Sequence, residues 1–150
     1  MPTSARAPDV LVDTSVAVAL SVANHDFHTA TIDALDGRRL GLAGHAAFET
    51  FSVLTRLPPP ARRPPGVVAR LMRENFPGTR FLTVEGAAEL LERLAGGEIA
   101  GGAVYDALVG AAAIEHGSTL ATLDRRALDT YRVLGVDVEL LSTGGQTEPS

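Results

Sequence analysis

Short apolar or alternating runs are interleaved along this chain with segments of helical period. The short runs predict strands at 10–12, 40–43, 81–84, 119–122 and 136–141. Apolar residues at helical spacing predict helices over 15–23, 27–35, 46–56, 66–75, 87–95, 103–116 and 125–132. Because strands separated by helices need right-handed crossovers, the pattern predicts an α/β fold: a central, mainly parallel sheet of about four to five strands, flanked by helices on both faces.

Proline and glycine mark the breaks between these elements. The proline-rich segment 58–65 cannot be helical throughout, because proline lacks the backbone donor and forces its predecessor into extended geometry. Gly117 stands where a left-handed cap is expected to close the helix 103–116. We expect one domain over 1–141, with a flexible start at 1–8 and a disordered polar tail at 142–150. In the helix 46–56 the candidate core residues are Phe48, Phe51, Val53 and Leu54.

Composition excludes several classes of function. The 150 residues carry 13 basic and 18 acidic side chains, a net charge of −5, and every basic residue is arginine. Without lysine the chain cannot form a P-loop or a Schiff base, and its acidity argues against nucleic-acid binding through bulk charge. The absence of cysteine excludes disulfides and thiolate metal sites. Because no signal peptide or membrane-spanning run is visible, we expect a cytoplasmic protein without a membrane partner.

Two aspartates follow predicted strands, at the sheet edge where ligands bind in open parallel α/β folds. Asp13 ends the first strand, and Asp124 follows the strand at 119–122. Each aspartate can equally be an N-cap of the next helix, a position that favours Asp. The sequence alone leaves both interpretations open.

Two further acids lie in mostly apolar helices. Asp106 stands near the start of the helix 103–116, and Glu49 lies between Phe48 and Phe51. Taken singly, Asp106 fits a first-turn acid and Glu49 fits the exposed side of an amphipathic helix. Together with Asp13 and Asp124 they suggest a cluster that repels itself unless arginine or a metal ion lies within it. Carboxylates without cysteine suit Mg²⁺ or Mn²⁺.

The ordered set of motifs resembles the PIN-domain nucleases, and most closely the VapC-type toxins of bacterial toxin–antitoxin pairs. It consists of Val-Leu-Val-Asp-Thr-Ser at 10–15, Phe-Glu at 48–49, Gly-Gly-Ala-Val-Tyr-Asp-Ala-Leu at 101–108, and the stretch from His-Gly at 116–117 to Leu-Ala-Thr-Leu-Asp-Arg-Arg at 120–126. The resemblance covers about 10–141. It implies Asp13, Glu49, Asp106 and Asp124 as catalytic acids, the three aspartates as metal ligands, and Thr122 and Ser15 as supporting residues.

The same resemblance implies an activity and partners. These are metal-dependent endoribonuclease action with Mg²⁺ or Mn²⁺, an RNA substrate, a cognate VapB-like antitoxin and a homodimer. The residues themselves do not separate RNA from DNA. Candidate RNA contacts are Arg125 and Arg126 beside Asp124, and Arg62 and Arg63, which we expect the prolines of the 58–65 insert to hold outward. All four arginines can instead be plain surface residues.

Two other functions remain open at this point. An aspartate-nucleophile phosphatase also begins with a strand that ends in Asp, but it needs a second acid two residues later and a lysine. This chain has Ser15 at that position and no lysine. The second alternative is a non-catalytic PIN-like binding module, in which the acids serve only as helix caps.

Overall fold

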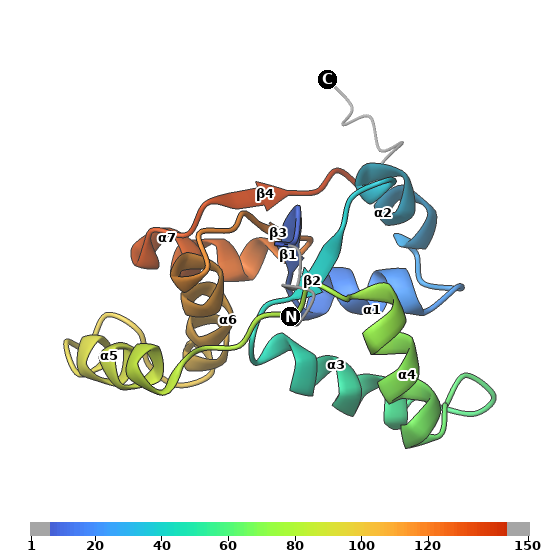
Figure 1. Cartoon of the computed structure of the whole chain (residues 1–150), viewed down its shortest axis with the longest axis horizontal. Coiled ribbons are helices and arrows are strands. Elements are labelled where there is room, and N and C mark those ends of the chain that lie inside the picture. The colour runs from blue at the N-terminus through green and yellow to red at the C-terminus, as the bar shows by residue number, and fades with distance from the viewer. Residues whose placement is uncertain (1–6, 144–150) are drawn as a thin grey trace, which may run out of the picture.

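A parallel four-stranded sheet forms the centre of the molecule (Figure 1). The computed structural model describes residues 7–143, so the predicted flexible start up to residue 6 and the predicted tail beyond 143 lie outside the described residues. The strands are β1 (Val10–Val12), β2 (Leu40–Leu42), β3 (Leu120–Thr122) and β4 (Val138–Leu140). They lie in the order β2-β1-β3-β4, and all three pairings are parallel. The predicted α/β fold is confirmed.

The helices follow the predicted segments closely. They are α1 (Thr14–Ser21), α2 (His28–Leu35), α3 (Ala46–Thr55), α4 (Pro65–Asn75), α5 (Val84–Leu94), α6 (Ala103–Glu115) and α7 (Leu128–Leu134). The segment predicted as one helix over 125–132 begins instead with a 3-10 turn, Arg125–Ala127, before α7. Gly117 has φ +62° after the end of α6, which confirms the left-handed cap.

The strand predicted at 81–84 is wrong. Phe81 to Thr83 has irregular backbone, and Val84 is the first residue of α5. The Thr83 side chain accepts a hydrogen bond from the Gly86 backbone, and the Thr83 hydroxyl donates to Glu115. A threonine that satisfies a free N–H group at a helix start favours the helix over a strand. The short apolar run alone did not distinguish these two outcomes.

Both faces of the sheet are covered by helices, as predicted (Figure 1). Successive side chains of a strand point to opposite faces, and β1 shows this directly. Val10 and Val12 pack with Val16 of α1 in one apolar cluster. Leu11, between them, packs with Val109 of α6 in another cluster. All three β1 residues are 0% exposed, so β1 is the centre of the core.

The proline-rich segment is irregular as predicted, but one predicted core residue of α3 is exposed. Residues 56–64 are irregular, as their prolines predict, and α4 begins at Pro65. Leu54 is fully buried in the core, but Phe48 is 64% exposed and is not a core residue. Phe48 lies on the outer side of α3, because Ala47 and Leu54 occupy its buried side.

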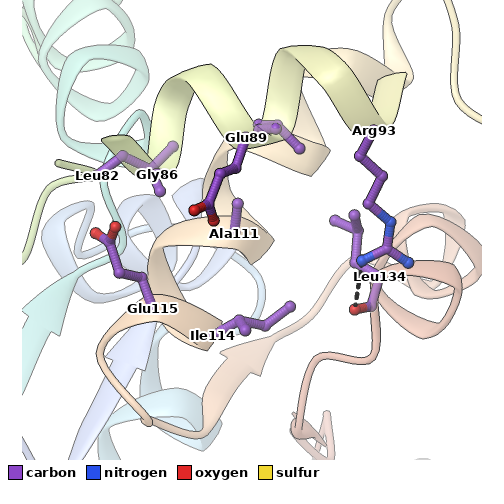
Figure 2. A pocket seen from close by; sticks show the side chains of 9 residues that line it. Leu82, Gly86, Glu89, Arg93, Ala111, Ile114, Glu115 and Leu134 are labelled. Atoms are coloured by element: carbon purple, nitrogen blue, oxygen red, sulfur yellow. Dashed lines mark hydrogen bonds between the residues drawn. The ribbon is translucent and has the colours of Figure 1, made fainter. Parts of the chain in front are cut away.

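The packing of α5 on α6 leaves a small cavity of about 220 Å³ (Figure 2). Arg93 of α5 closes one end by donating from Nη1 to the backbone oxygen of Leu134, at 3.2 Å. At the other end Glu115 accepts two hydrogen bonds from Thr83, which lower the pKa of Glu115. None of the four predicted catalytic acids lines this cavity. In the described part of the chain, no helix combines the length and the apolarity needed to cross a membrane.

Candidate active site

Asp13 and Asp124 follow two adjacent strands of the sheet. Asp13 comes directly after β1, and Asp124 comes two residues after β3. The strand order β2-β1-β3-β4 makes the gap between β1 and β3 the point where the chain's connections diverge to opposite sides of the sheet. Ligands of open parallel sheets bind at such points, beyond the carboxyl ends of the strands. The predicted position of the two aspartates is therefore confirmed.

The carboxylate of Asp13 accepts four hydrogen bonds. Asp13 Oδ1 accepts from the Ser15 hydroxyl at 2.5 Å and from the Val16 backbone at 3.2 Å. Asp13 Oδ2 accepts from the Thr122 hydroxyl at 2.5 Å and from the Tyr131 hydroxyl at 3.0 Å. A carboxylate has about four lone-pair sites, so these donors fill it. Asp13 is only 4% exposed, and its orientation is fixed by three different elements.

Burial and hydrogen bonding act in opposite directions on Asp13. Desolvation is the larger effect and raises the pKa of Asp13, while the donors from Ser15, Thr122, Val16 and Tyr131 lower it. The pKa of Tyr131 is raised by burial and then by the charge of Asp13, so the phenol keeps its proton and remains a donor. The four donors therefore help to hold a charge in a place where the protein interior disfavours it.

Two hydroxyl groups connect Asp13 to the backbone after β3. The Thr122 hydroxyl accepts from the Asp124 N–H at 3.0 Å while donating to Asp13. The Ser15 hydroxyl accepts from the Leu123 N–H at 3.0 Å while donating to the other oxygen of Asp13. Thr122 and Ser15, the predicted supporting residues, thus fix the loop that carries Asp124 relative to Asp13.

Asp106 responds electrostatically to the other three acids. Partial burial is the first cause that raises its pKa, and the charges of Asp124, Glu49 and Asp13 follow, bringing the pKa to about 6. Arg126 acts in the opposite direction. Charges affect one another in this way only at short range, so the structure brings the four predicted acids together.

Capping and clustering are both true of the strand-end aspartates. Asp13 caps α1 by accepting from the Val16 N–H, and Asp124 caps the 3-10 turn by accepting from the Arg126 N–H. Glu49, in the first turn of α3, is half-buried and accepts a hydrogen bond from the Thr14 hydroxyl at 3.3 Å. The two interpretations that the sequence left open are therefore not exclusive.

The chemistry of the four acids fits a hard divalent cation, but their side chains do not yet form a metal-binding group. Among residues 7–143, no three Asp, Glu or His side chains are arranged to hold an ion. Asp13 is filled by its donors, and Asp124 Oδ1 lies 3.4 Å from Arg126 Nε. A cation that received Asp124 would therefore replace this contact with Arg126. The oxygen donors and the mutual repulsion that raises the Asp106 pKa both favour a bound divalent cation.

The four candidate arginines differ in their surroundings. Arg125 and Arg126 are exposed beside Asp124, as predicted. Arg62 is exposed and donates to the Leu57 backbone oxygen at 2.9 Å. Arg63 is half-buried, and its Nη1 is buried without a hydrogen-bond partner in the described residues. The expectation that the prolines hold Arg63 outward is therefore wrong.

Tyr131 and Thr14 were not among the site residues predicted from the sequence. Tyr131 is 1% exposed on α7, where Leu128 and Leu134 occupy the same buried side at a spacing of three residues. A tyrosine in such a stripe needs a partner for its hydroxyl, and this was the available signal. Nothing in the sequence indicated that this partner is Asp13. Thr14 stood within the quoted motif but without a role.

Comparison with known proteins gives consistent matches over nearly the whole chain. The model of one protein family, the PIN domain, matches residues 10–133. Ribonuclease VapC27 of Mycobacterium tuberculosis is 49% identical over 131 residues, which cover 87% of this chain and 96% of that protein. Ribonuclease VapC40 of the same species is 43% identical over 132 residues, which cover 87% of this chain and 97% of that protein. The PIN-domain match includes all four clustered acids.

Proposed function

Because this chain belongs to the PIN-domain family and is of the VapC ribonuclease type, we propose that it is a metal-dependent endoribonuclease and the toxin of a toxin–antitoxin pair. The observation that carries the proposal is the proximity of four carboxylates at the switch point of the sheet: Thr122 links Asp13 to the Asp124 backbone, the Thr14 hydroxyl beside Asp13 donates to Glu49, and the other three charges raise the pKa of Asp106. They include the two strand-end aspartates and the only acids in the first turns of α3 and α6. Such a site binds hard cations and, through them, the phosphates of a nucleic acid.

Three aspartates are the proposed metal ligands, namely Asp13, Asp106 and Asp124. A bound Mg²⁺ or Mn²⁺ supplies a water of lowered pKa and neutralises charge on the phosphate. The hydroxyls of Ser15, Thr122 and Tyr131 orient Asp13, which is the best-fixed member of the set. Asp124 is held at the site by the backbone bond from its N–H to Thr122.

Glu49 is the proposed residue that orients the attacking water. The Thr14 hydroxyl donates to Glu49 Oε1, which fixes the side chain at the edge of the cluster. A carboxylate held by one oxygen can accept a proton from water at the other, as a general base does. Arg125 and Arg126, exposed next to Asp124, are proposed contacts for the substrate phosphates.

The geometry argues against the phosphatase alternative. A phosphatase of this kind needs a second acid two residues after its nucleophile, whereas this chain has Ser15 there, and the Ser15 hydroxyl donates to Asp13 Oδ1. Asp13 is also 4% exposed, and the chain has no lysine to assist such a reaction. We expect no hydrolysis of aryl phosphates by the purified protein.

Two partners belong to the same proposal. A VapB-like antitoxin is expected to place a basic segment over the acidic site, where charge complementarity favours it. The chain is also expected to form a homodimer. Sedimentation of the purified protein at high concentration tests the homodimer, and a monomer there would contradict it.

The decisive experiment is cleavage of a mixed RNA pool with Mg²⁺ or Mn²⁺, with and without a chelator. We expect RNA cleavage that the chelator abolishes. Asp106→Asn should reduce the cleavage rate by at least about a hundredfold, because the metal ion loses one ligand and stabilises the charge of the transition state less well. Asp129→Asn is the matched control, because Asp129 is an exposed acid outside the cluster. Cleavage that survives the chelator would contradict metal dependence. A protein that cuts no RNA under any of these conditions would support the binding-module alternative.

A further inference from the structure

Four aromatic rings form a continuous row next to the acidic site. The rings of Tyr105 and His45 are stacked, with centroids 5.4 Å apart and planes at 21°. His45 lies 6.3 Å from Phe48, and Phe48 lies 5.9 Å from Phe81, in both cases with tilted planes. We call these four residues the aromatic row. Its rings come from α6, from the start of α3 and from the segment before α5.

The aromatic row is unusually exposed. Phe48 is 64% exposed, Tyr105 is 55% exposed and Phe81 is 51% exposed. The chain has five phenylalanines, two tyrosines and no tryptophan, so three of its seven aromatic residues of these types lie on this row. Exposed apolar surface that is gathered in one place, and not scattered, marks a binding site.

The row is joined to the acids through the chain itself. Phe48 precedes Glu49 on α3, and Tyr105 precedes Asp106 on α6. A cavity of about 640 Å³ is lined by both kinds of residue, among them Thr14, His45, Phe48, Glu49, Arg56 and Tyr105. A molecule in this cavity therefore contacts aromatic rings and at least one of the four acids at once.

The charge of the chain limits how it can hold a nucleic acid. Affinity from bulk electrostatics needs clustered lysine and arginine, whereas this chain has a net charge of −5 and no lysine. Stacking of bases on aromatic rings needs no net charge and tolerates any base, since every base has a flat face. Stacking can thus supply affinity for a single-stranded nucleic acid that this acidic surface does not supply through electrostatic attraction.

We propose that the aromatic row is a base-stacking subsite, where unpaired bases of the RNA bind beside the carboxylates. This inference rests on the proposed function and names how its substrate is held. Tyr105 and Phe48 are positioning residues in it: they hold bases, and the adjoining backbone phosphate is thereby brought over Glu49 and Asp106. Because double-stranded RNA keeps its bases stacked inside, the subsite selects single-stranded RNA.

The test couples removal of a ring to removal of a base. A fluorescent single-stranded RNA of about ten nucleotides, and a series in which each nucleotide in turn is abasic, are titrated by anisotropy in the presence of chelator. The proteins are wild type, Phe48→Ala, Tyr105→Ala, Tyr105→Phe and Tyr105→Leu. Leu91→Ala is the matched control, since Leu91 is 69% exposed on α5, away from the row.

We expect one or two abasic positions to weaken binding to wild type by at least about fivefold, as the loss of a stacked base does. Tyr105→Ala or Phe48→Ala should weaken the intact RNA by a similar factor and should be insensitive to those same abasic positions. Tyr105→Phe should behave as wild type and Tyr105→Leu as Tyr105→Ala, because leucine keeps bulk but has no aromatic face. Binding that is as tight in both alanine variants as in wild type and Leu91→Ala would overturn the proposal, as would wild-type binding that no abasic position weakens.

The principal rival is that a second copy of the chain covers the row. Sedimentation of the same variants distinguishes the two: dissociation of a dimer by Phe48→Ala or Tyr105→Ala, without coupling to any abasic position, would overturn the base-stacking subsite. Failure of the proposed function is a separate outcome. If wild type shows the expected coupling between rings and bases but cuts no RNA with Mg²⁺ or Mn²⁺, the base-stacking subsite is supported and the proposed nuclease function is contradicted. If wild type cuts RNA but no abasic position is coupled to a ring, only the base-stacking subsite is contradicted.

Discussion

Thr122 Oγ1 lies 2.5 Å from Asp13 Oδ2 and accepts a hydrogen bond from the Asp124 backbone N–H at 3.0 Å. The hydroxyl has one proton, which it donates as a hydrogen bond to the buried carboxylate. Thr122 is 0% exposed, so no water replaces either bond. The Thr122 side chain therefore connects the end of β3 to the acid at the end of β1, and it fixes the position of the Asp124 backbone.

Replacing Thr122 by valine should destabilise the protein and disturb the site together. Valine has the same shape but leaves Asp13 without one donor and the Asp124 N–H without an acceptor, and each unsatisfied buried group costs about 1–3 kcal/mol. Urea unfolding should show a loss of about 2–6 kcal/mol for the two groups together, and Thr122→Ser, which keeps the hydroxyl, should recover most of it. Equal stability of the valine and serine variants would contradict the role of this hydroxyl.

Asp13→Asn should abolish RNA cleavage while the fold persists. The amide oxygen can accept the capping bond from Val16, and asparagine caps helices about as well as aspartate. The amide nitrogen of asparagine fits the hydroxyl donors around residue 13 less well than a carboxylate oxygen does. This loss of stability is offset because the variant no longer buries a charge that desolvation disfavours. Circular dichroism and cleavage should be measured on one preparation, with Asp129→Asn as the control. Full activity in Asp13→Asn would remove Asp13 from the site.

The position of the site could be predicted from the sequence because it depends on local signals. A strand of three apolar residues that ends in aspartate, as at 10–13, places that aspartate at the carboxyl edge of a parallel sheet. The same reasoning placed Asp124, and the apolar surroundings of Asp106 and Glu49 suggested their convergence. Each inference used only the residue type, the neighbours and the predicted element.

The remaining features depend on contacts that no local pattern contains. Tyr131 reaches Asp13 across 118 positions of sequence, and its apolar neighbours suit an ordinary core residue equally well. Phe48 follows the helical period of α3, but the sequence does not say that its side of the helix faces the exposed aromatic row. Thr83 selects a helix over the predicted strand partly through Glu115, which is 32 positions away. Tertiary contacts decide in each case.

Tyr131→Phe should weaken the protein by removing one donor from a buried carboxylate. Phenylalanine preserves the packing on α6, so the change isolates the hydrogen bond to Asp13. Hydrogen bonds to charged groups contribute about 1.5–3 kcal/mol, and urea unfolding at neutral pH should show a loss of that order. Tyr105→Phe is the matched control, since Tyr105 is exposed, and it should leave stability unchanged. A Tyr131→Phe variant as stable as wild type would contradict the bond.

Asp106 should make the metal-free protein less stable as the pH rises. Its pKa is about 6 in the folded protein against an ordinary value of 3.8, so the folded state binds the proton more tightly than the unfolded state. The stabilisation is fully present below about pH 3.8 and is lost as the pH rises through about 6. The melting temperature of Asp106→Asn minus that of wild type, both in chelator, should therefore increase from pH 4 to pH 6 and level off above it. A difference that is constant over this range would contradict the raised pKa.

The metal assignment can be tested without measuring activity. An ion that binds only the folded protein stabilises it by RT ln(1 + [L]/Kd), about 2.7 kcal/mol at a hundredfold excess over Kd. Titration with Mn²⁺ or Mg²⁺ should therefore raise the melting temperature of wild type and of Asp129→Asn alike, and that of Asp13→Asn much less.

The size of this shift should also depend on pH, because a cation must displace the proton that Asp106 holds below about pH 6. At a fixed metal concentration, wild type should gain more at pH 7.5 than at pH 5.5. In Asp106→Asn this pH dependence should largely disappear, since the group that competes for the ion is gone. A purely structural role for the acids would produce no metal-induced shift in any variant, and equal shifts in wild type and Asp13→Asn would mean that the ion binds without Asp13. Only binding inside the cluster makes the shift depend on both Asp13 and the protonation of Asp106.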